Sequence, residues 1–482
     1  MRDLLRESRR PHRVREHRYA PWFAVGAVCI GAFMGQLDAS IVTLAFPALE
    51  REFGASLAAV QWVYLGYLLV LVALLAGAGR LADVAGRKLV YLYGFVVFTA
   101  ASAACGLAPS LAVLVACRLV QAAGAAMLQA NSVALVVSSV PRARMRTGLS
   151  MQAAAQALGL ALGPALGGVL VATAGWRWVF WINVPVGCAA VIAGRYLLPR
   201  TRQRGRGGRF DWPGLVLLAA STSALLLAAS VISGLDLPSW SVPVLLAVAA
   251  GTAIGFWRWE ARVPSALIDT ALLRSRVVTA GLAGALGGYL VLFGPLVLIP
   301  QVLVAGGTGE LVAGLVLTAL PGGFAASALM GDHLLPRTWG DRRRCVAGAV
   351  LAAAGCALLA ADPVAEGWAG ACLAVTGAGL GLFVPANNTV VMAAVPERVS
   401  ATAGGMVNMA RGIGTALGIA VVTLALHLAG AHEAGARAAP AVLAAVALLA
   451  ALTASGRVVR PGGRPLPWSV MTNVRRGEPR ER

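Results

Sequence analysis

The sequence predicts an all-α protein that crosses a membrane about fourteen times. Of its 482 residues 59% are hydrophobic and only 12% are charged, whereas a soluble domain has about 25% charged residues. Mean hydropathy is +0.77, and the apolar residues form runs of the roughly 20 residues that a helix needs to cross the hydrocarbon. The net charge is +20. Because the arginines lie between apolar runs, we expect a lipid surface as the partner and no nucleic acid.

The apolar runs give the expected spans in order. They are residues 21–47, 58–79, 88–107, 111–139, 147–173, 178–198, 212–233, 241–258, 277–303, 311–331, 345–361, 367–393, 401–428 and 437–456.

A weak internal repeat divides these spans. "MQAAAQALGLALG" (151–163) aligns with "MVNMARGIGTALG" (406–418), and equivalent segments in two six-span halves are typical of duplicated transporters. The two spans left over follow the basic linker. The expected parts are a basic cytoplasmic tail (1–20), an N-terminal six-helix bundle (21–198), a basic cytoplasmic linker (199–211), two extra transmembrane helices (212–258), a second cytoplasmic linker (259–276), a C-terminal six-helix bundle (277–456) and a basic cytoplasmic tail (457–482).

The positions of the basic residues predict the orientation. With an even number of spans both termini lie on one side, and that side then carries 35 of the 40 Lys and Arg residues. The other side carries three, Arg51, Arg177 and Arg437, while Arg118 and Arg411 fall inside spans. Basic loops stay in the cytoplasm. We therefore expect a multi-pass plasma-membrane protein with both termini cytoplasmic.

The loop between the second and third spans reads "GRLADVAGRK" (79–88). Its glycines allow tight helix ends, and its basic side chains can donate hydrogen bonds to the aspartate and to the last carbonyls of neighbouring helices. The residues concerned are Gly79, Arg80, Asp83, Gly86, Arg87 and Lys88.

The fifth span contains "GLALGPALGG" (159–168). We expect Gly159, Gly163, Gly167 and Gly168 to clear one face for close helix approach, and Pro164 to bend the helix.

Together these stretches resemble the major facilitator superfamily, and specifically its fourteen-span drug:proton antiporter branch. The 79–88 loop resembles the superfamily's signature loop, which in the family biases the inward/outward equilibrium, and the 159–168 segment resembles the antiporter motif of exporters. "QWVYLGYLL" (61–69), "WRWVFWINVPVG" (176–187) and "LDASIVTLAFP" (37–47) resemble segments of the fourteen-span branch. The resemblance implies two six-helix bundles that rock about a central site.

Three ionisable residues lie deep inside spans, namely Asp38, Arg118 and Arg411. A charge near the bilayer centre costs about 2.5 to 3.5 kcal/mol on insertion scales, so such residues usually serve function. At 1.5 Å per residue, Asp38 lies about 26 Å from the inner start of its span and Arg118 about 10 Å from the outer start of its own.

These depths are similar, and we therefore expect Asp38 and Arg118 to interact directly or through water. "RLVQAAGAA" (118–126) also resembles a family motif of the fourth span, which lines the cavity together with the first. Burial disfavours the ionised carboxylate and the guanidinium favours it, so Asp38 is the candidate at which proton and substrate compete. The alternative is a structural ion pair.

Arg411 lies near the midplane, with no acid at similar depth in its half of the chain. It either binds an anionic group of the substrate or caps carbonyls of an opposing helix. Other candidates for the cavity are polar residues that could equally bond between helices; for Asn387 and Asn388, after Pro385, we expect a broken helix. These candidates are Gln36, Tyr64, Tyr67, Gln121, Gln129, Asn131, Gln152, Gln156, Asn387, Asn388 and Asn408.

Other functional classes find little support. No GxxxxGK[ST] loop is present, which argues against ATP-driven export, and no convergent nucleophile, base or metal cluster suggests an enzyme. We expect a monomer that needs no cofactor or metal and draws its energy from the proton gradient. The expected function is proton-coupled efflux of drugs, antibiotics or similar amphipathic small molecules. The alternatives are a transporter for a specific metabolite and a sensor that does not transport.

Overall fold

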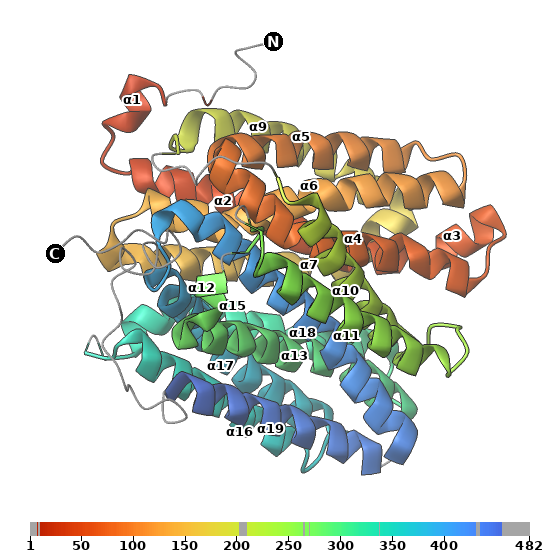
Figure 1. Ribbon diagram of the computed structural model, residues 1–482. Helices are drawn as coiled ribbons and strands as arrows, with labels where there is room; N and C mark the ends of the chain where they lie inside the picture. The colour runs from red at the N-terminus through yellow and green to blue at the C-terminus, as the bar shows by residue number, and fades with distance from the viewer. Residues whose placement is uncertain are drawn as a thin grey trace.

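In the computed structural model the chain folds into long helices that lie side by side (Figure 1). The structure describes residue 7 and residues 10–201, 210–263, 266–268, 270–336, 338–429 and 434–455. The predicted basic tail 457–482 and most of the predicted linker 199–211 lie outside these residues. Throughout the described residues the secondary structure is helical, without a strand.

The first half of the chain supplies the helices drawn in red to yellow in Figure 1. After the short α1 (His12–Arg15), they are α2 (Ala20–Ile41), η1 (Val42–Ala45), α3 (Phe46–Phe53), α4 (Leu57–Ala85), α5 (Arg87–Gly106), α6 (Leu111–Ser139), η2 (Arg142–Arg144), α7 (Met145–Thr173), α8 (Trp178–Trp181) and α9 (Asn183–Leu197).

The remaining helices are drawn in green to blue. They are α10 (Trp212–Ile232), α11 (Ser241–Glu260), α12 (Thr270–Arg274), α13 (Arg276–Ala305), α14 (Glu310–Leu317), α15 (Ala319–Leu334), α16 (Asp341–Leu359), α17 (Glu366–Ala393), η3 (Glu397–Val399), α18 (Ser400–Ala429) and α19 (Ala434–Ser455).

Thirteen helical stretches of the described chain are long and apolar enough to cross a membrane. The remaining expected span is α16, whose first turn carries three consecutive arginines. With α16 the structure accommodates the predicted fourteen. The first span is longer than predicted because Pro47 lies in the first turn of α3, where its missing N–H costs nothing, so the helix continues to Phe53.

Each half of the chain is built around an apolar core. One joins α2, α4, α5 and α6 through residues such as Val28, Phe95 and Leu135. The other joins α13, α15, α16, α17 and α19 through residues such as Ile299 and Leu373. The halves meet where α4 packs on α18 and α7 packs on α15. Helix α10 lies across α4 and α18, and α11 packs on α10, so this pair covers the junction from outside.

The two ends of the bundle differ in charge. At one end, which we call the basic face, the last turn of α4 meets the start of α18, and Arg146 of α7 pairs with Asp341 of α16. The opposite face carries acids such as Glu52 and Glu366. Which of the two faces lies in the cytoplasm stays a prediction.

Candidate functional site

Asp38 and Arg118 form a direct ion pair in the first half of the chain. The Arg118 Nη1 atom lies 2.7 Å from Asp38 Oδ2, which joins α2 to α6. Both side chains are 0% exposed. The contact predicted from their depths is therefore present, and it needs no bridging water.

Two amides complete the hydrogen bonding of the carboxylate. Gln121 donates from Nε2 to Asp38 Oδ1 at 3.0 Å, and Asn183 of α9 donates from Nδ2 to the same oxygen at 2.9 Å. Both amides also donate to the hydroxyl of Ser102 on α5, at 2.6 and 3.4 Å. Four helices thus contribute donors or acceptors to one buried cluster, which we call the Asp38 network (Asp38, Ser102, Arg118, Gln121 and Asn183).

Arg118 is held from its other sides as well. Its Nε donates to the carbonyl of Val63 at 3.1 Å and its Nη1 to Gln121 Oε1 at 2.6 Å. The ring of Tyr67 covers the guanidinium at 4.1 Å, an arrangement that stabilises a desolvated cation. Its Nη2 has no hydrogen-bond partner among the described residues. The cation therefore depends on Asp38 for its charge balance.

The network differs from the sequence prediction in two ways. Asp38 was expected at the surface of a cavity, but protein donors occupy both of its oxygens and no part of it is exposed. Ser102 and Asn183 were not predicted. Asn183 is a lone amide in the apolar run "WVFWINVPVG", and its position could have indicated a buried polar contact. Ser102 in "AASAACG" could not, because small residues of this kind are common in membrane helices.

The glycines of α7 position α2, and with it Asp38. A Cβ at Gly159 would meet the carbonyl oxygen of Phe33 at 2.4 Å, and Cβ atoms at Gly163 and Gly167 would meet Ser40 and Ile41. The spacing of four residues places all three on the face that packs against α2. Gly168 is an exception to the prediction, because a Cβ there meets nothing within 4 Å. Pro164 lies inside α7, which continues past it.

The expected 79–88 loop is helical up to Ala85, and Asp83 in the last turn of α4 joins the two halves at the basic face through contacts that we call the Asp83 clamp. Asp83 is 0% exposed and accepts hydrogen bonds from the backbone N–H groups of Ala401 and Thr402, at 3.1 and 2.7 Å, and from the Thr402 hydroxyl at 2.8 Å. These groups are the first turn of the 30-residue α18, where a helix attracts negative charge.

Basic residues of the loop extend this clamp. Arg87 pairs with Asp83 at 3.2 Å and donates to the carbonyl of Glu397. Lys88 donates to the carbonyls of Arg195 and Leu198 at the end of α9, at 2.7 and 3.0 Å. Arg80 is half-buried.

Of the two glycines expected to allow tight helix ends, only Gly86 does so. Gly79 lies inside α4, which continues to Ala85, and there it allows the close approach of α18 instead. Gly86 has φ +121° and joins α4 to α5, and a Cβ at Gly79 would meet the Ala401 carbonyl oxygen at 2.4 Å.

A second polar cluster lies where the halves touch. Asn408 of α18 donates to the carbonyl of Gln129 on α6 at 2.8 Å, and the Tyr289 hydroxyl of α13 lies 3.5 Å from Gln156 Oε1 on α7. Arg411 donates to Asn408 Oδ1 at 3.1 Å, and its guanidinium lies 4.9 Å from the Tyr289 ring centre. We call these five residues the junction cluster.

Other predicted cavity residues mostly bond between or within helices. Asn387 donates to the carbonyl of Gly281 on α13 at 2.9 Å, and the Oδ1 of Asn388 is buried without a hydrogen-bond partner in the described part of the chain. The expected break after Pro385 is wrong, because α17 runs unbroken to Ala393; one lost hydrogen bond does not end a helix that neighbours support on every side.

The remaining candidates lie at varied depths. Gln36 and Tyr64 are half-buried. Asn131 donates within α6 to Met127, and Gln152 donates to Ser132. Gln121 and Tyr67, expected in the cavity, belong to the surroundings of Arg118.

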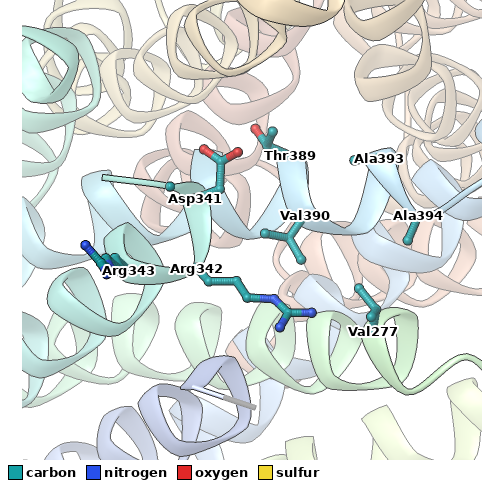
Figure 2. A pocket seen from close by; sticks show the side chains of 9 residues that line it. Val277, Asp341, Arg342, Arg343, Thr389, Val390, Ala393 and Ala394 are labelled. Atoms are coloured by element: carbon teal, nitrogen blue, oxygen red, sulfur yellow. The ribbon is translucent and has the colours of Figure 1, made fainter. Parts of the chain in front are cut away.

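A shallow groove of about 590 Å³ opens at the basic face, away from both clusters. Figure 2 shows Arg342 and Arg343 of α16 at one side of it, with Val277 of α13 and Val390 of α17 nearby. None of the predicted cavity residues lines it.

Comparison with known proteins gives consistent matches. Residues 28–419 match the family model of the Major Facilitator Superfamily. The multidrug resistance protein Stp of Mycobacterium tuberculosis is 33% identical over 82% of this chain and 74% of its own length. The tetracenomycin C resistance and export protein of Streptomyces glaucescens is 31% identical, over 84% and 76%. The riboflavin transporter RibZ of Clostridioides difficile is 29% identical, over 83% and 87%.

Among solved structures, the human organic anion transporter MFSD10 superimposes with a TM-score of 0.67 at 17% identity, over 90% of this chain and 99% of its own. That similarity shows the fold. The paired helix bundles, the Asp83 clamp and a family match over most of the sequence lead to one conclusion: this chain belongs to the Major Facilitator Superfamily and is related to its multidrug and antibiotic resistance transporters.

Proposed function

We propose that the protein is a proton-coupled antiporter that exports drugs, antibiotics or similar amphipathic small molecules across the plasma membrane, with its basic face in the cytoplasm. The resistance and export functions in the names of its relatives support export. The glycine face of α7 supports it too, since that segment resembles the motif of exporters.

The proposal of proton coupling rests on which residues make up the Asp38 network. When Asp38 is ionised, its charge balances Arg118 at 2.7 Å and its oxygens accept from Gln121 and Asn183. Protonation removes the negative charge and leaves Arg118 buried without a counterion, which is costly. A single proton therefore weakens the contacts that hold α2 against α6 and α9, and favours a different packing of this half.

The depth of the network gives the coupling a direction. Asp38 lies 18 residues into α2, about 27 Å from the basic face. It is thus nearer the opposite face, from which a proton enters down its gradient. Since the substrate does not reach the sealed carboxylate in this conformation, we infer that proton and substrate act on each other through the packing of the halves.

An Asp38→Asn variant tests the proposal because asparagine has nearly the same shape but cannot exchange a proton. In everted vesicles with an imposed pH gradient, the wild type is expected to accumulate ethidium or a fluorescent aromatic acid. The Asp38→Asn variant is expected to lose gradient-driven accumulation while still allowing downhill exchange.

The matched control is Glu52→Gln. Glu52 also pairs with an arginine, Arg177, at 2.7 Å, but this pair is partly exposed at the opposite face. The control is expected to retain coupled transport. Full gradient-driven accumulation by Asp38→Asn would refute the role of Asp38, and accumulation in right-side-out vesicles alone would indicate uptake.

Transport of a specific metabolite is the second candidate, favoured by the similarity to a riboflavin transporter. A metabolite transporter is expected to show saturable movement of one compound and no competition between unrelated ones. Competition by several unrelated amphipathic compounds for the same efflux favours the first proposal.

A further inference from the structure

Among the described residues, two buried arginines lie far from the ends of their membrane spans, and one of these two has a carboxylate as counterion. Arg118 pairs with Asp38 at 2.7 Å. Arg411 is 4% exposed, and among the described residues no carboxylate forms an ion pair with it. An uncompensated charge at this depth is expensive and persists where function needs it.

The described residues around Arg411 are neutral, and they accept few of the hydrogen bonds that its guanidinium can donate. A guanidinium offers five N–H donors. In the described chain its hydrogen bond is the one from Nη1 to Asn408 Oδ1 at 3.1 Å, and the Tyr289 ring lies 4.9 Å from it. The sequence left open whether Arg411 caps carbonyls of an opposing helix. The carbonyl of Gln129 on the opposing helix α6 accepts its hydrogen bond from Asn408 and not from Arg411.

The junction cluster also differs from the Asp38 network in accessibility. Asp38 and Arg118 are 0% exposed, whereas Arg411, Tyr289 and Gln156 are 4%, 5% and 7% exposed. The junction cluster is thus slightly less buried than the Asp38 network. Arg411 lies 11 residues into α18, about 16 Å from the basic face, which is near the midplane.

The cluster is built from both halves of the chain, with α6 and α7 on one side and α13 and α18 on the other. Its hydrogen bonds across the junction join neutral groups, at 2.8 Å from Asn408 to Gln129 and at 3.5 Å from Tyr289 to Gln156. An acidic group would supply the missing negative charge and accept two hydrogen bonds from the guanidinium. It would also accept a hydrogen bond from the side-chain amide of Asn408. The stacked rings of Tyr289 and Phe293 give an apolar aromatic surface beside it.

We propose that the junction cluster is a substrate subsite that recognises a carboxylate or similar acidic group on an aromatic, amphipathic compound, with Arg411 as the residue that binds the charge. This proposal rests on the proposed function, because the halves must separate at the junction to admit the compound. It names acidic amphipathic molecules, rather than multiply cationic dyes, as the preferred substrate class.

Equilibrium binding to the purified full chain in lipid nanodiscs tests this subsite without a proton gradient. The probes are anthracene-9-carboxylate, its methyl ester and 9-(aminomethyl)anthracene, read by fluorescence anisotropy against empty nanodiscs. The wild type is expected to bind the carboxylate about tenfold or more tightly than the ester, the range of a charge-assisted hydrogen bond. Arg411→Gln is expected to bring this ratio to about one by weakening only the carboxylate.

Two further variants keep the result decisive. Arg411→Lys retains the charge and is expected to keep a reduced preference, because lysine lacks the planar pair of donors. Arg51→Gln removes a charge from an exposed residue at the opposite face and is expected to leave the ratio unchanged. Equal loss of all three probes in Arg411→Gln, no carboxylate preference in the wild type, or an Arg411→Lys ratio of one overturns the proposal.

The subsite and the coupling mechanism can fail separately. Asp38→Asn is expected to keep the carboxylate preference in this binding assay. If that variant still couples protons while Arg411→Gln loses the preference, the coupling proposal fails and the subsite stands. If the wild type shows no preference while Asp38→Asn abolishes coupled transport, the subsite fails and the coupling proposal stands.

Discussion

At the scale of single residues, the ion pair between Asp38 and Arg118 stabilises the helix packing while both charges are present and destabilises it when either charge is lost. Two charges have been removed from water, and their attraction offsets that cost only while both are present. Gln121 and Asn183 satisfy the carboxylate further. The pair is therefore held in place by the packing of four helices and is sensitive to the loss of either charge.

Removing one partner tests this coupling energetically. Arg118→Gln leaves a buried carboxylate without its cation and is expected to destabilise the protein by about 3 to 5 kcal/mol. Asp38→Asn combined with Arg118→Gln leaves two neutral side chains and is expected to recover most of that loss. Thermal unfolding of the purified variants in detergent measures both effects. A double variant less stable than Arg118→Gln alone would contradict the account.

The sequence predicted this pair because charges are rare enough in apolar runs to be matched by depth. It could not predict the neutral members of the network. Ser102 and Asn183 come from α5 and α9, and small polar residues are common in membrane helices whether or not they meet a partner. The sealed position of Asp38 was also not predictable, because helix rotation depends on packing that span lengths do not determine.

At the scale of helices, the fit of α7 against α2 depends on glycine at one face. Gly159→Ala is expected to destabilise the protein by about 1 to 3 kcal/mol, because the added Cβ meets the backbone oxygen of Phe33 at 2.4 Å. Gly168→Ala is the matched control in the same helix and is expected to be neutral, since nothing lies within 4 Å of its Cβ position. Thermal unfolding and efflux of both variants check this. Equal effects would show that the glycine face does not set the packing.

The Asp83 clamp gives a second prediction at this scale. Asp83→Asn removes the negative charge from the start of α18 and from Arg87, so the first turn of α18 is expected to open more often. Hydrogen exchange of the amides of Ala401 and Thr402, followed by mass spectrometry, should become faster.

Glu397→Gln is the control for the clamp. It removes a nearby carboxylate, but only the backbone carbonyl of Glu397 contacts Arg87. Exchange as slow in Asp83→Asn as in this control would contradict the clamp.

Most span bounds were predictable to within a few residues because hydrophobic length is set by the bilayer. The second span is an exception, because α4 continues six residues past the predicted bound, to Ala85. Two errors came from proline. Pro47 did not end the first span and Pro385 did not break α17. In both places the neighbouring helices supply packing that a single sequence does not reveal, and a proline in the first turn or within a supported membrane helix is tolerated.

At the scale of the whole molecule, the halves touch mainly along α4 with α18 and α7 with α15. The contacts near the basic face are the stronger ones, with the Asp83 clamp and the pair between Arg146 and Asp341 at 2.8 Å. The junction cluster lies further in and uses neutral bonds. Charged contacts therefore close the molecule at its basic face, and the transport proposed above requires these contacts to break.

The orientation of the molecule is a prediction of its own. If the basic face lies in the cytoplasm, green fluorescent protein fused after the C-terminus is expected to fluoresce, and alkaline phosphatase at the same position is expected to be inactive. The reverse pattern would contradict the positive-inside argument.

The central claim is that Asp38 is the group that takes up the coupling proton. Infrared difference spectroscopy of the purified protein in lipid, between high and low pH, measures this directly. If Asp38 takes up the proton, low pH is expected to produce a carbonyl band of a protonated, buried carboxylic acid that is missing from Asp38→Asn and retained in Glu52→Gln. Identical spectra of the wild type and Asp38→Asn across the pH range in which transport operates would contradict it.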